Sequence, residues 1–530
     1  MLAGDGFLGL GLDEQGKSEH PFACARVSMI DVRDVGACAA ALLAQPGSPA
    51  ESAHNGATYD LSGPAAVAVG DELASAVSAL HPQPITVTPC TASELLARRM
   101  PGLPAPVAAN LEGFLAVLGG ECSEVTDTVE RLCGRPATSV EQYVNEHASE
   151  FLPTSYRRLL GRAAGSFGEG AEVVTQPLAA ELEALGEGEL LIKVLVAGVN
   201  GGVDTFSVTR AAPDAKDLKL GAEGIGMVVA CGGGADVAHF AVGQRVLFLG
   251  GGYSEYVRLG AKACFTPPPT EATTAMIDPA ELVALRISGL TAATALGRTA
   301  TISKGDVVVV TACCGATGSF AVQEAVARGA TVVGTVGSDE KAAAARALGV
   351  SRVVNYKAEK LGAVLAADFP QGIAVAYEGV GGALLKDVVD SLADDGTILL
   401  VGSISQYPHN TEVEPHGIPG VADAMDIFRA GETVDLGNGR SIVGNVWGDA
   451  FGALEPDGQR TLTAIRDSMY ERHKRGELTA LVDDRQPGAP RFAGVEQAAA
   501  AVAHMLAGRN VGKVVVRVAW DAGPVGVAGR

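Results

Sequence analysis

The sequence is poor in aromatic and basic residues. Aromatic residues make up 5% of its 530 residues, and Lys plus Arg number 40 against 61 Asp plus Glu. A net charge of -21 repels the phosphates of nucleic acids and the headgroups of anionic lipids. We therefore expect no nucleic acid as a partner and no electrostatic attachment to a membrane.

Long apolar runs are also missing. No stretch approaches the roughly 18 uninterrupted apolar residues that suggest a transmembrane helix. The N-terminal run MLAGDGFLGLGLDEQGK has no basic region before its apolar residues, so it does not match a secretory signal. We expect no membrane insertion.

The sequence also lacks paired cysteine motifs of the CxxC type. The number of cysteines is odd, and their scatter fits neither a disulfide framework nor a zinc site. Reduced thiols in an intracellular compartment are expected; the cytoplasm is favoured and an organelle is left open. The nine cysteines are Cys24, Cys38, Cys90, Cys122, Cys133, Cys231, Cys264, Cys313 and Cys314.

The composition is that of an ordinary globular protein, with 47% apolar residues. The length of the chain suits two to four domains. Residues 1–151 mix short strands and helices: VSMIDVRDVGACAAALLAQPG reads as a strand then a helix, and TYDLSGP as a strand. VAVGDELASAVSAL places Val67, Leu73, Val77 and Leu80 on one helical face. SVEQYVNEHASEF reads as a further helix, capped by Ser139.

The rest of the chain divides into two patterns. Residues 155–290 contain short β-type runs separated by glycines, such as ELLIKVLVAGVN and GQRVLFLGGG, which predict a β-rich domain. Residues 291–420 alternate strand and helix, which predicts a parallel sheet wound with helices on both faces. Residues 421–520 end in the strand-like GKVVVRVAW and are expected to complete the β-rich domain. The predicted fold class is α/β.

A glycine-rich turn is the strongest local signal for chemistry. Four valines, Val307–Val310, lead into a turn that ends with Gly315, Ala316, Thr317 and Gly318, and a helix follows. Glycines let the backbone approach a pyrophosphate, and the helix N-terminus supplies amide donors. The AxxGxxG spacing is weak alone, but its strand–turn–helix context indicates a dinucleotide site. A plain tight turn is the alternative.

The end of the next strand, TVVGTV, favours NADP over NAD. An Asp or Glu usually holds the ribose 2′-hydroxyl of NAD there, but this chain has Gly337. Ser338 and Lys341 can donate hydrogen bonds to a 2′-phosphate. The alternative is that Ser338 only caps a helix and that Lys341 is a solvated charge.

Residues 155–520 resemble the zinc-independent quinone oxidoreductase group of the medium-chain dehydrogenase/reductase superfamily. The matching segments follow the family's order over about two-thirds of the chain. They are GVN at 198–200, AEGIGMVVA at 222–230, SGLTAATAL at 288–296, TACCGATGSFAVQ at 311–323, GTVGSDEK at 334–341, VVNYK at 353–357, YEGVGG at 377–382, VGSIS at 401–405 and GRNVGKVVV at 508–516. The resemblance implies a GroES-like domain at 155–290 and 421–520, and a Rossmann domain at 291–420.

The resemblance also implies roles in NADPH binding. Thr317 would lie over the pyrophosphate, and Ser338, Lys341 and Tyr356 would surround the 2′-phosphate. Val401 and Tyr407 would line the nicotinamide end, and Asn510 would close on the cofactor. Gly337 and Gly379 stand where relatives usually carry serine, which removes two hydrogen bonds.

Zinc is not expected, because the Gly-His-Glu of zinc-dependent relatives is replaced by Gly221-Ala222-Glu223 and no four-cysteine lobe exists. Without a Lewis acid, reduction of an α,β-unsaturated carbonyl (an enone) at its C=C bond, or of a quinone, is the expected reaction. Asn200 and Tyr407 are the candidate catalytic residues, each interpreted as a positioning group. Ser207–Arg210 contains no tyrosine where the family usually has one, so the exact substrate does not carry over. A homodimer is implied by the resemblance only.

Residues 25–151 resemble the C-terminal part of NmrA-like atypical short-chain proteins. The segments are SMIDVRDVGACAAALL, TYDLSGP and EVTDTVERLCGRPATSVEQYVNEHASEF. The glycine-rich turn of those proteins is missing, because GDGFLGLGLDEQG follows no strand. We expect a partial α/β segment without its own nucleotide site, packed on the reductase. A redox sensor or scaffold that binds NADPH with little turnover remains the alternative function, and a structural protein that retains only the fold is a weaker one.

Overall fold

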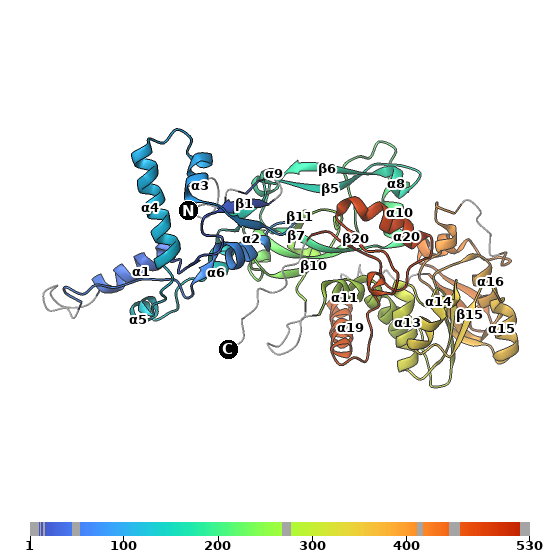
Figure 1. Cartoon of the computed structure of the whole chain (residues 1–530). Coiled ribbons are helices and arrows are strands. Elements are labelled where there is room, and N and C mark those ends of the chain that lie inside the picture. Colours follow the sequence, from blue (N-terminus) through green and yellow to red (C-terminus); the bar gives the residue numbers. More distant parts are fainter. Residues whose placement is uncertain are drawn as a thin grey trace.

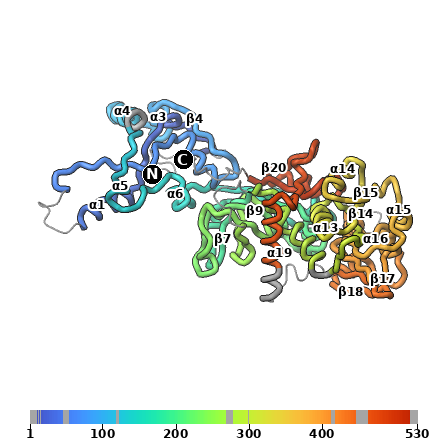
Figure 2. Tube along the Cα trace, turned by 90° about the horizontal axis from the view of Figure 1, so that it is seen from below, coloured from blue at the N-terminus to red at the C-terminus, as the bar shows by residue number. Residues whose placement is uncertain are grey.

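The computed structural model describes residues 10, 12–13, 16–44, 54–267, 277–410, 417–444 and 456–519. The molecule is elongated and has three parts in line (Figures 1 and 2). The N-terminal segment forms one end, a β-rich domain lies in the middle, and a parallel sheet with helices forms the other end. Most of the GDGFLGLGLDEQG run lies outside the described residues.

The middle part is built on a seven-stranded sheet around β7. Nine of the ten residues of β7 are buried, because different layers cover its two faces. Leu190, Ile192 and Val194 point into the core of the domain itself, and Leu191 points toward the N-terminal segment. The sheet runs β12 (Cys264–Phe265), β10 (Arg245–Leu249), β9 (Glu223–Cys231), β7 (Glu189–Gly198), β21 (Val515–Arg517) and β20 (Phe492–Ala493), and β11 (Tyr256–Gly260) also pairs with β7. A separate sheet joins β6 (Ala171–Pro177), β5 (Ser155–Gly161) and β8 (Leu218–Lys219).

A second seven-stranded sheet forms the far end, and all its neighbours are parallel except β18 and β19. Its order is β15 (Arg352–Asn355), β14 (Thr331–Val336), β13 (Val307–Val310), β16 (Ile373–Glu378), β17 (Leu392–Leu400), β19 (Arg440–Val443) and β18 (Thr433–Gly437). Alternate valines of β13 point to opposite faces, so Val308 and Val310 join one core and Val307 and Val309 the other. The sheet is therefore doubly wound, as predicted.

Helices cover both faces of this sheet (Figure 1). On the first face lie α13 (Ala316–Ala327) and α14 (Asp339–Ala347). On the second lie α15 (Leu361–Asp368), α16 (Gly382–Asp390) and α17 (Ala424–Ala430). The order of strands reverses between β13 and β16, and that reversal is where open α/β sheets hold ligands.

The expected assignment of residues 421–520 to the β-rich domain is wrong for part of that segment. β19 pairs in parallel with β17, and β18 returns antiparallel to it, so residues 433–443 belong to the Rossmann sheet. The turn between them is Asn438-Gly439, and both residues have a positive φ (53° and 72°). This is the geometry of a two-residue hairpin, which adds the pair to the edge of the sheet.

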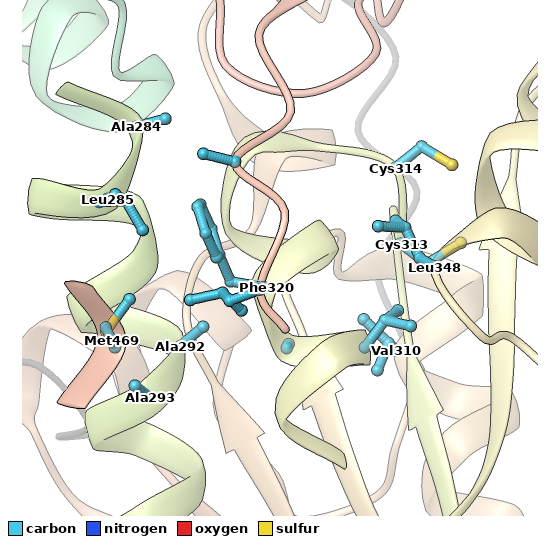
Figure 3. Close-up of a cluster of buried hydrophobic side chains, with 14 of the residues drawn as sticks. Ala284, Leu285, Ala292, Ala293, Val310, Cys313, Cys314, Phe320, Leu348 and Met469 are labelled. Atoms are coloured by element: carbon cyan, nitrogen blue, oxygen red, sulfur yellow. The ribbon is translucent and has the colours of Figure 1, made fainter. Parts of the chain in front are cut away.

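A long apolar helical stretch connects the two domains. It comprises α11 (Pro279–Ala284), η4 (Leu285–Gly289), α12 (Leu290–Thr294) and η5 (Ala295–Thr299). Residues 279–297 are long and apolar enough to cross a membrane, but 89% of the tested window is buried within the fold, as in a core helix. Figure 3 shows Phe320 of α13 and Met469 of α19 (Pro456–Lys474) close to this stretch. A Cβ on Gly289 would approach Met469 to 2.5 Å, so glycine lets α19 pack closely.

The N-terminal segment contains short strands in two two-stranded sheets and a set of helices. Ser139 caps α6 by accepting the N–H of Gln142 at 3.1 Å, as predicted. Leu73, Val77 and Leu80 of the predicted helical face are fully buried, but Val67 lies in the short strand β3, so the helix begins later than predicted. TYDLSGP forms no strand, so that prediction is wrong. The elements are β1 (Lys17–His20), β2 (Arg26–Val27), α1 (Val32–Leu43), β3 (Val67–Ala68), η1 (Val69–Leu73), α2 (Ala74–Ser78), β4 (Thr86–Pro89), α3 (Ala92–Arg99), α4 (Ala105–Glu121), α5 (Thr128–Cys133), α6 (Val140–Glu146) and α7 (Ala148–Phe151).

This segment packs on the β-rich domain, as expected. Leu191 and Tyr256 share one apolar cluster with Leu73 and Leu80. Lys193 is fully buried, and its Nζ donates to the carbonyls of Ser78 at 3.2 Å and Ala79 at 2.9 Å, at the C-terminal end of α2. The hydroxyl of Tyr256 donates to the carbonyl of Leu80. The two parts therefore share one core.

Candidate active site

The glycine-rich turn joins β13 to α13 at the reversal of strand order. Gly315 stands at the N-cap of α13, where no side chain caps the first N–H groups. A Cβ on Gly318 would lie 2.4 Å from the carbonyl oxygen of Ala312, so the turn requires glycine there. Ala312 adopts a φ of 47°, which is uncommon for a residue with a side chain. No side chain caps the start of this helix, and a helix N-terminus is suited to an anionic group.

A segment of the β-rich domain lies directly against this turn. Gly512 donates its N–H to the carbonyl of Cys314 at 2.7 Å, and a parallel bridge joins Gly512 to Gly315. The buried Asn510 donates its Nδ2 to the carbonyl of Gly512 at 2.8 Å, which braces the segment. Asp483 accepts the N–H of Val511 at 2.7 Å. Asn510 therefore lies beside the turn, and its contact with the cofactor stays a prediction.

Ser338, Lys341 and Tyr356 follow the ends of β14 and β15. Ser338 is the N-cap of α14, but its side chain makes no capping hydrogen bond with the helix. Lys341 donates its Nζ to the carbonyl of Gly508 at 2.6 Å, so it bridges the two domains. Burial lowers its pKa from 10.5. The Tyr356 hydroxyl would lie 2.8 Å from a Cβ on Gly337, so glycine keeps space beside that ring.

Tyr407 reaches from the Rossmann sheet to the start of α10 (Gly201–Thr209), next to Asn200. Its hydroxyl would be 2.9 Å from a Cβ on Gly202, so the absence of a side chain there admits the phenol. Burial raises the pKa of Tyr407 to about 12, so it stays a hydrogen-bond donor at neutral pH. Val401, just after β17, is partly buried, and its Cγ2 would be 3.5 Å from a Cβ on Gly379. The structure thus brings together both predicted catalytic residues.

The amide of Asn200 is held by a buried ion pair. Lys513 and Glu223 are 0% and 1% exposed, and the Lys513 Nζ lies 2.6 Å from Glu223 Oε1. The same Nζ donates to Asn200 Oδ1 at 2.8 Å. Asn200 Nδ2 donates to Glu223 Oε1 at 2.9 Å and to the carbonyl of Gly198 at 3.2 Å. Both amide hydrogens are used, so Asn200 is oriented by this network and is not free to donate elsewhere.

A second buried acid braces the backbone at Asn200. Asp204 accepts the N–H of Asn200 at 2.7 Å and the hydroxyl of Tyr253 at 2.8 Å through Oδ2. Burial raises the pKa of Asp204 from 3.8 to about 6. Its other oxygen, Oδ1, has no hydrogen-bond partner. The start of α10 is therefore fixed by two buried acids, Glu223 and Asp204.

Glu378 is a further titratable group at the reversal of strand order. It is the last residue of β16, fully buried, and accepts the N–H groups of Val380 at 2.7 Å and Gly381 at 2.5 Å. Burial raises its pKa from 4.5 to about 7. A partly protonated carboxyl therefore lies where the sheet opens toward a ligand.

Sequence reasoning missed several of these residues. Lys513 and Glu223 carried a signal, because each is charged within an otherwise apolar strand segment, but their contact joins residues 290 apart. Phe206 packs edge-on against Tyr407 with ring centroids 4.9 Å apart, and Arg210 lies 3.5 Å above the Phe206 ring. The stretch that lacks the family's tyrosine therefore contributes the cationic Arg210, and Phe206 directly before it contributes an aromatic ring.

Metal ligands do not gather in the described part of the chain. No group of three or more His, Cys, Asp or Glu side chains there could hold a metal ion. At the place compared with Gly-His-Glu, Ala222 has no ligand atom, and the Glu223 carboxylate is paired with the Lys513 ammonium.

The β-rich domain packs against the glycine-rich turn of the doubly wound sheet. This two-domain arrangement is the architecture of a class of oxidoreductases. Residues 186–269 match the family model of the alcohol dehydrogenase GroES-like domain, and residues 316–435 match that of zinc-binding dehydrogenase. The chain belongs to the medium-chain dehydrogenase/reductase superfamily of oxidoreductases.

Curated relatives cover the same two domains. Prostaglandin reductase-3 of Mus musculus is 33% identical over 338 residues, which are 63% of this chain and 82% of the relative. A probable quinone oxidoreductase of Leishmania amazonensis is 31% identical over 340 residues, which are 63% of this chain and 91% of the relative.

Solved structures agree with this fold. A quinone oxidoreductase of Pseudomonas syringae pv. Tomato DC3000 has a TM-score of 0.53 and 26% identity, and the match covers 68% of this chain and 99% of that one. The Escherichia coli quinone oxidoreductase complexed with NADPH has a TM-score of 0.53 at 22% identity, and its match covers 68% of this chain and 99% of that chain. The NmrA-like resemblance of residues 25–151 stays a prediction.

Proposed function

We propose that this protein is an NADPH-dependent reductase that transfers hydride to the C=C bond of an α,β-unsaturated carbonyl or to a quinone, without zinc. The observation that carries the proposal is the convergence of the predicted cofactor residues at one edge of the Rossmann sheet. Gly315–Gly318, Ser338, Lys341, Tyr356, Val401 and Tyr407 all follow the carboxyl ends of its strands. The β-rich domain adds Asn510 through the contact of Gly512 with the turn.

The side chains fit the chemical parts of NADPH. The helix N-terminus at Ala316 and Thr317 would hold the pyrophosphate, and glycine at 318 keeps the turn compact. Lys341 and Ser338 would donate to the 2′-phosphate, and Tyr356 would flank it. Asp339, which would repel that phosphate, accepts the amide of Asn355 at 2.9 Å. Relatives include the NADP-dependent oxidoreductase RED1 of Cochliobolus heterostrophus, which supports the choice of NADP over NAD.

The reacting end is organised by residues of this chain. NADPH supplies the hydride when it is bound. The Tyr407 hydroxyl is a protonated donor at neutral pH, and we assign it the hydrogen bond to the oxygen on which charge develops. Asn200 acts as a positioning residue, because the Gly198 carbonyl and Glu223 accept both hydrogens of its amide, and Lys513 donates to its oxygen. Phe206 and Val401 exclude water with their apolar surfaces.

Independence from zinc is part of the proposal. The Lys513 ammonium already neutralises Glu223, at 2.6 Å, so this carboxylate is not a free metal ligand. Ala222 removes the ligand that a histidine would supply. The reaction then depends on hydrogen-bond donors for stabilisation of negative charge.

Turnover by the purified full chain tests the proposal. We expect loss of NADPH absorbance with enones or quinones, products reduced at the expected bond by mass spectrometry, and unchanged rates after treatment with a zinc chelator. Loss of activity on chelation and its recovery with added zinc would refute zinc independence.

A redox sensor or scaffold that binds NADPH with little turnover is the second candidate function. It is favoured by the engagement of the Asn200 amide, which leaves one donor fewer at the reacting end. Tight NADPH binding with no turnover across a broad panel of enones, enals and quinones would establish this function in place of the reductase.

We also propose a homodimer in an intracellular, reducing compartment. β18 is the last strand of the Rossmann sheet, with β19 as its one neighbour in the described part of the chain. An edge of this kind can pair with a second copy. Light scattering that reports a monomer at working concentration would remove this part of the proposal.

A further inference from the structure

Two cysteines of the N-terminal segment face each other across a contact between helices. Cys38 lies in α1, and Cys133 is the last residue of α5. Their Sγ atoms are 3.6 Å apart, although 95 residues separate them in the sequence. Both are free thiols in this structure. A modest rotation of either side chain would bring the sulfurs toward bonding distance.

Polar contacts one helical turn away set the register of this pair. Asp34, four residues before Cys38, is fully buried and accepts the N–H of Thr138 at 2.7 Å. Its Oδ1 lies 2.8 Å from the guanidinium of Arg135. Gly134, with a φ of 68°, ends α5 and turns the chain so that Arg135 reaches Asp34. Because residues four apart share one side of a helix, these bonds place Cys38 opposite Cys133.

The attachment of α1 to the rest of the fold depends on the same two side chains. Asp34 and Cys38 are the buried residues of this 12-residue helix. Val32 and Leu43 at its ends are 78% and 86% exposed. A covalent bond at Cys38 would therefore tie down a helix that few buried side chains hold.

We propose that Cys38 and Cys133 are an oxidisable pair, which hydrogen peroxide converts to a disulfide that joins α1 to α5. Cys133 is partly exposed and Cys38 is buried, so peroxide reaches Cys133 first. Burial raises the pKa of the Cys38 thiol, which keeps it protonated and protects it from direct oxidation.

The chemistry is a two-electron oxidation. Peroxide transfers one oxygen to the Cys133 sulfur, which becomes a sulfenic acid, and one water leaves. The Cys38 sulfur then attacks the Cys133 sulfur, the S–S bond forms and the S–O bond breaks. The hydroxyl leaves with the Cys38 proton as a second water, so one peroxide is reduced to two waters while two thiols are oxidised.

Peptide mapping of the full chain tests this pair. The chain is treated with peroxide, quenched, alkylated, digested and examined by mass spectrometry. We expect loss of alkylation at both cysteines, a cross-linked peptide that contains Cys38 and Cys133, and recovery of both thiols with dithiothreitol. Slower amide hydrogen exchange across α1 in the oxidised protein should accompany the cross-link.

Three variants make the result decisive. Cys38→Ser and Cys133→Ala should each abolish the cross-link. Because Cys133 is partly exposed, Cys133→Ala is expected to fold even if substitution of the buried Cys38 prevents folding. Cys231→Ser, at an exposed cysteine in β9, is the matched control and should form the cross-link as the wild type does. Peroxide that oxidises Cys231 but leaves Cys38 and Cys133 open to alkylation would overturn the proposal, as would a cross-link of Cys133 to any other cysteine.

Discussion

The buried Lys513–Glu223 pair gives the sharpest prediction about how the site is held. In Lys513→Met, the ammonium is lost while a side chain of similar length fills the space. The Glu223 carboxylate, 1% exposed, is then left without its charge partner, and the Asn200 amide loses the donor 2.8 Å from its oxygen. Breaking a buried pair in this way costs about 3–5 kcal/mol of folding free energy.

A second substitution separates the lost charge balance from lost packing. Lys513→Met combined with Glu223→Gln removes both charges but keeps an oxygen that can accept the Ile287 N–H, now 3.2 Å from Glu223 Oε2. We expect the double variant to recover more than half of the free energy lost in the single variant, because no unpaired charge stays buried.

Urea unfolding followed by circular dichroism measures both variants, with the wild type and Lys386→Ala beside them. Lys386 forms an exposed pair with Asp390, so its variant should change stability by less than about 1 kcal/mol. If Lys513→Met also loses less than about 1 kcal/mol, the pair behaves like an exposed one and the reasoning fails.

Three further predictions follow from buried titratable groups. Tyr407→Phe should lower kcat by about 10–100-fold with a smaller change in KM for NADPH, because one hydrogen bond to a developing charge is lost; an unchanged kcat in steady-state assays would exclude the donor role. The raised pKa of Asp204, about 6 against 3.8, means that the folded state favours the protonated acid, so its contribution to stability is full below pH 3.8 and is lost as the pH rises through 6. Asp204→Asn should therefore be more stable than the wild type at pH 8, by up to about 3 kcal/mol, and thermal melts should show this difference vanish at low pH. A difference in stability that is equal at all pH values would contradict this assignment. Burial lowers the pKa of His81 from 6.5 to about 4, so the contribution of this histidine to stability is full above pH 6.5 and is lost as the pH falls toward 4. His81→Gln should flatten this pH dependence of stability, which hydrogen exchange in α2 measures. A pH profile that the substitution leaves unaltered would count against this assignment.

The Rossmann part of the fold was predictable because its signals are local. The four valines of β13, the glycines at 315 and 318 and the helix that follows lie within one short segment. Strand–helix alternation then fixes a parallel sheet and puts all residues after its strands at one edge. For that reason Ser338 and Lys341 could be placed at this edge from the strand pattern, whereas Tyr407 was placed by the resemblance to the family.

Two errors have identifiable physical reasons. TYDLSGP looks extended, but Ser62 exchanges side-chain hydrogen bonds with Thr126, and Gly63 lies against the Met29 carbonyl, so these contacts hold the segment where strand pairing was expected. The hairpin at Asn438-Gly439 did carry a sequence signal, because Asn-Gly favours tight hairpins. Its assignment to the wrong domain came from treating 421–520 as one block.

Long-range charge pairing accounts for what could not be foreseen at the site. The orientation of Asn200 depends on Lys513, 313 residues away, and on Glu223. The packing of the N-terminal segment on the β-rich domain depends on the hydrogen bond from Lys193 to the carbonyl of Ala79 at the end of α2, and 114 residues separate the two in the sequence. No local pattern encodes such contacts, since each partner alone reads as a charge within an apolar strand.

The most direct test of an NADPH-dependent reductase is the cofactor preference of wild type, Lys341→Ala and Lys386→Ala, taken as the ratio of kcat/KM for NADPH to that for NADH with one enone substrate. The wild type and Lys386→Ala should share a strong preference for NADPH. Lys341→Ala should lose about 10–100-fold of it, because a charged hydrogen bond to the 2′-phosphate disappears while NADH kinetics stay nearly unchanged. Equal use of both cofactors by the wild type, or a preference that survives in Lys341→Ala, would contradict the account.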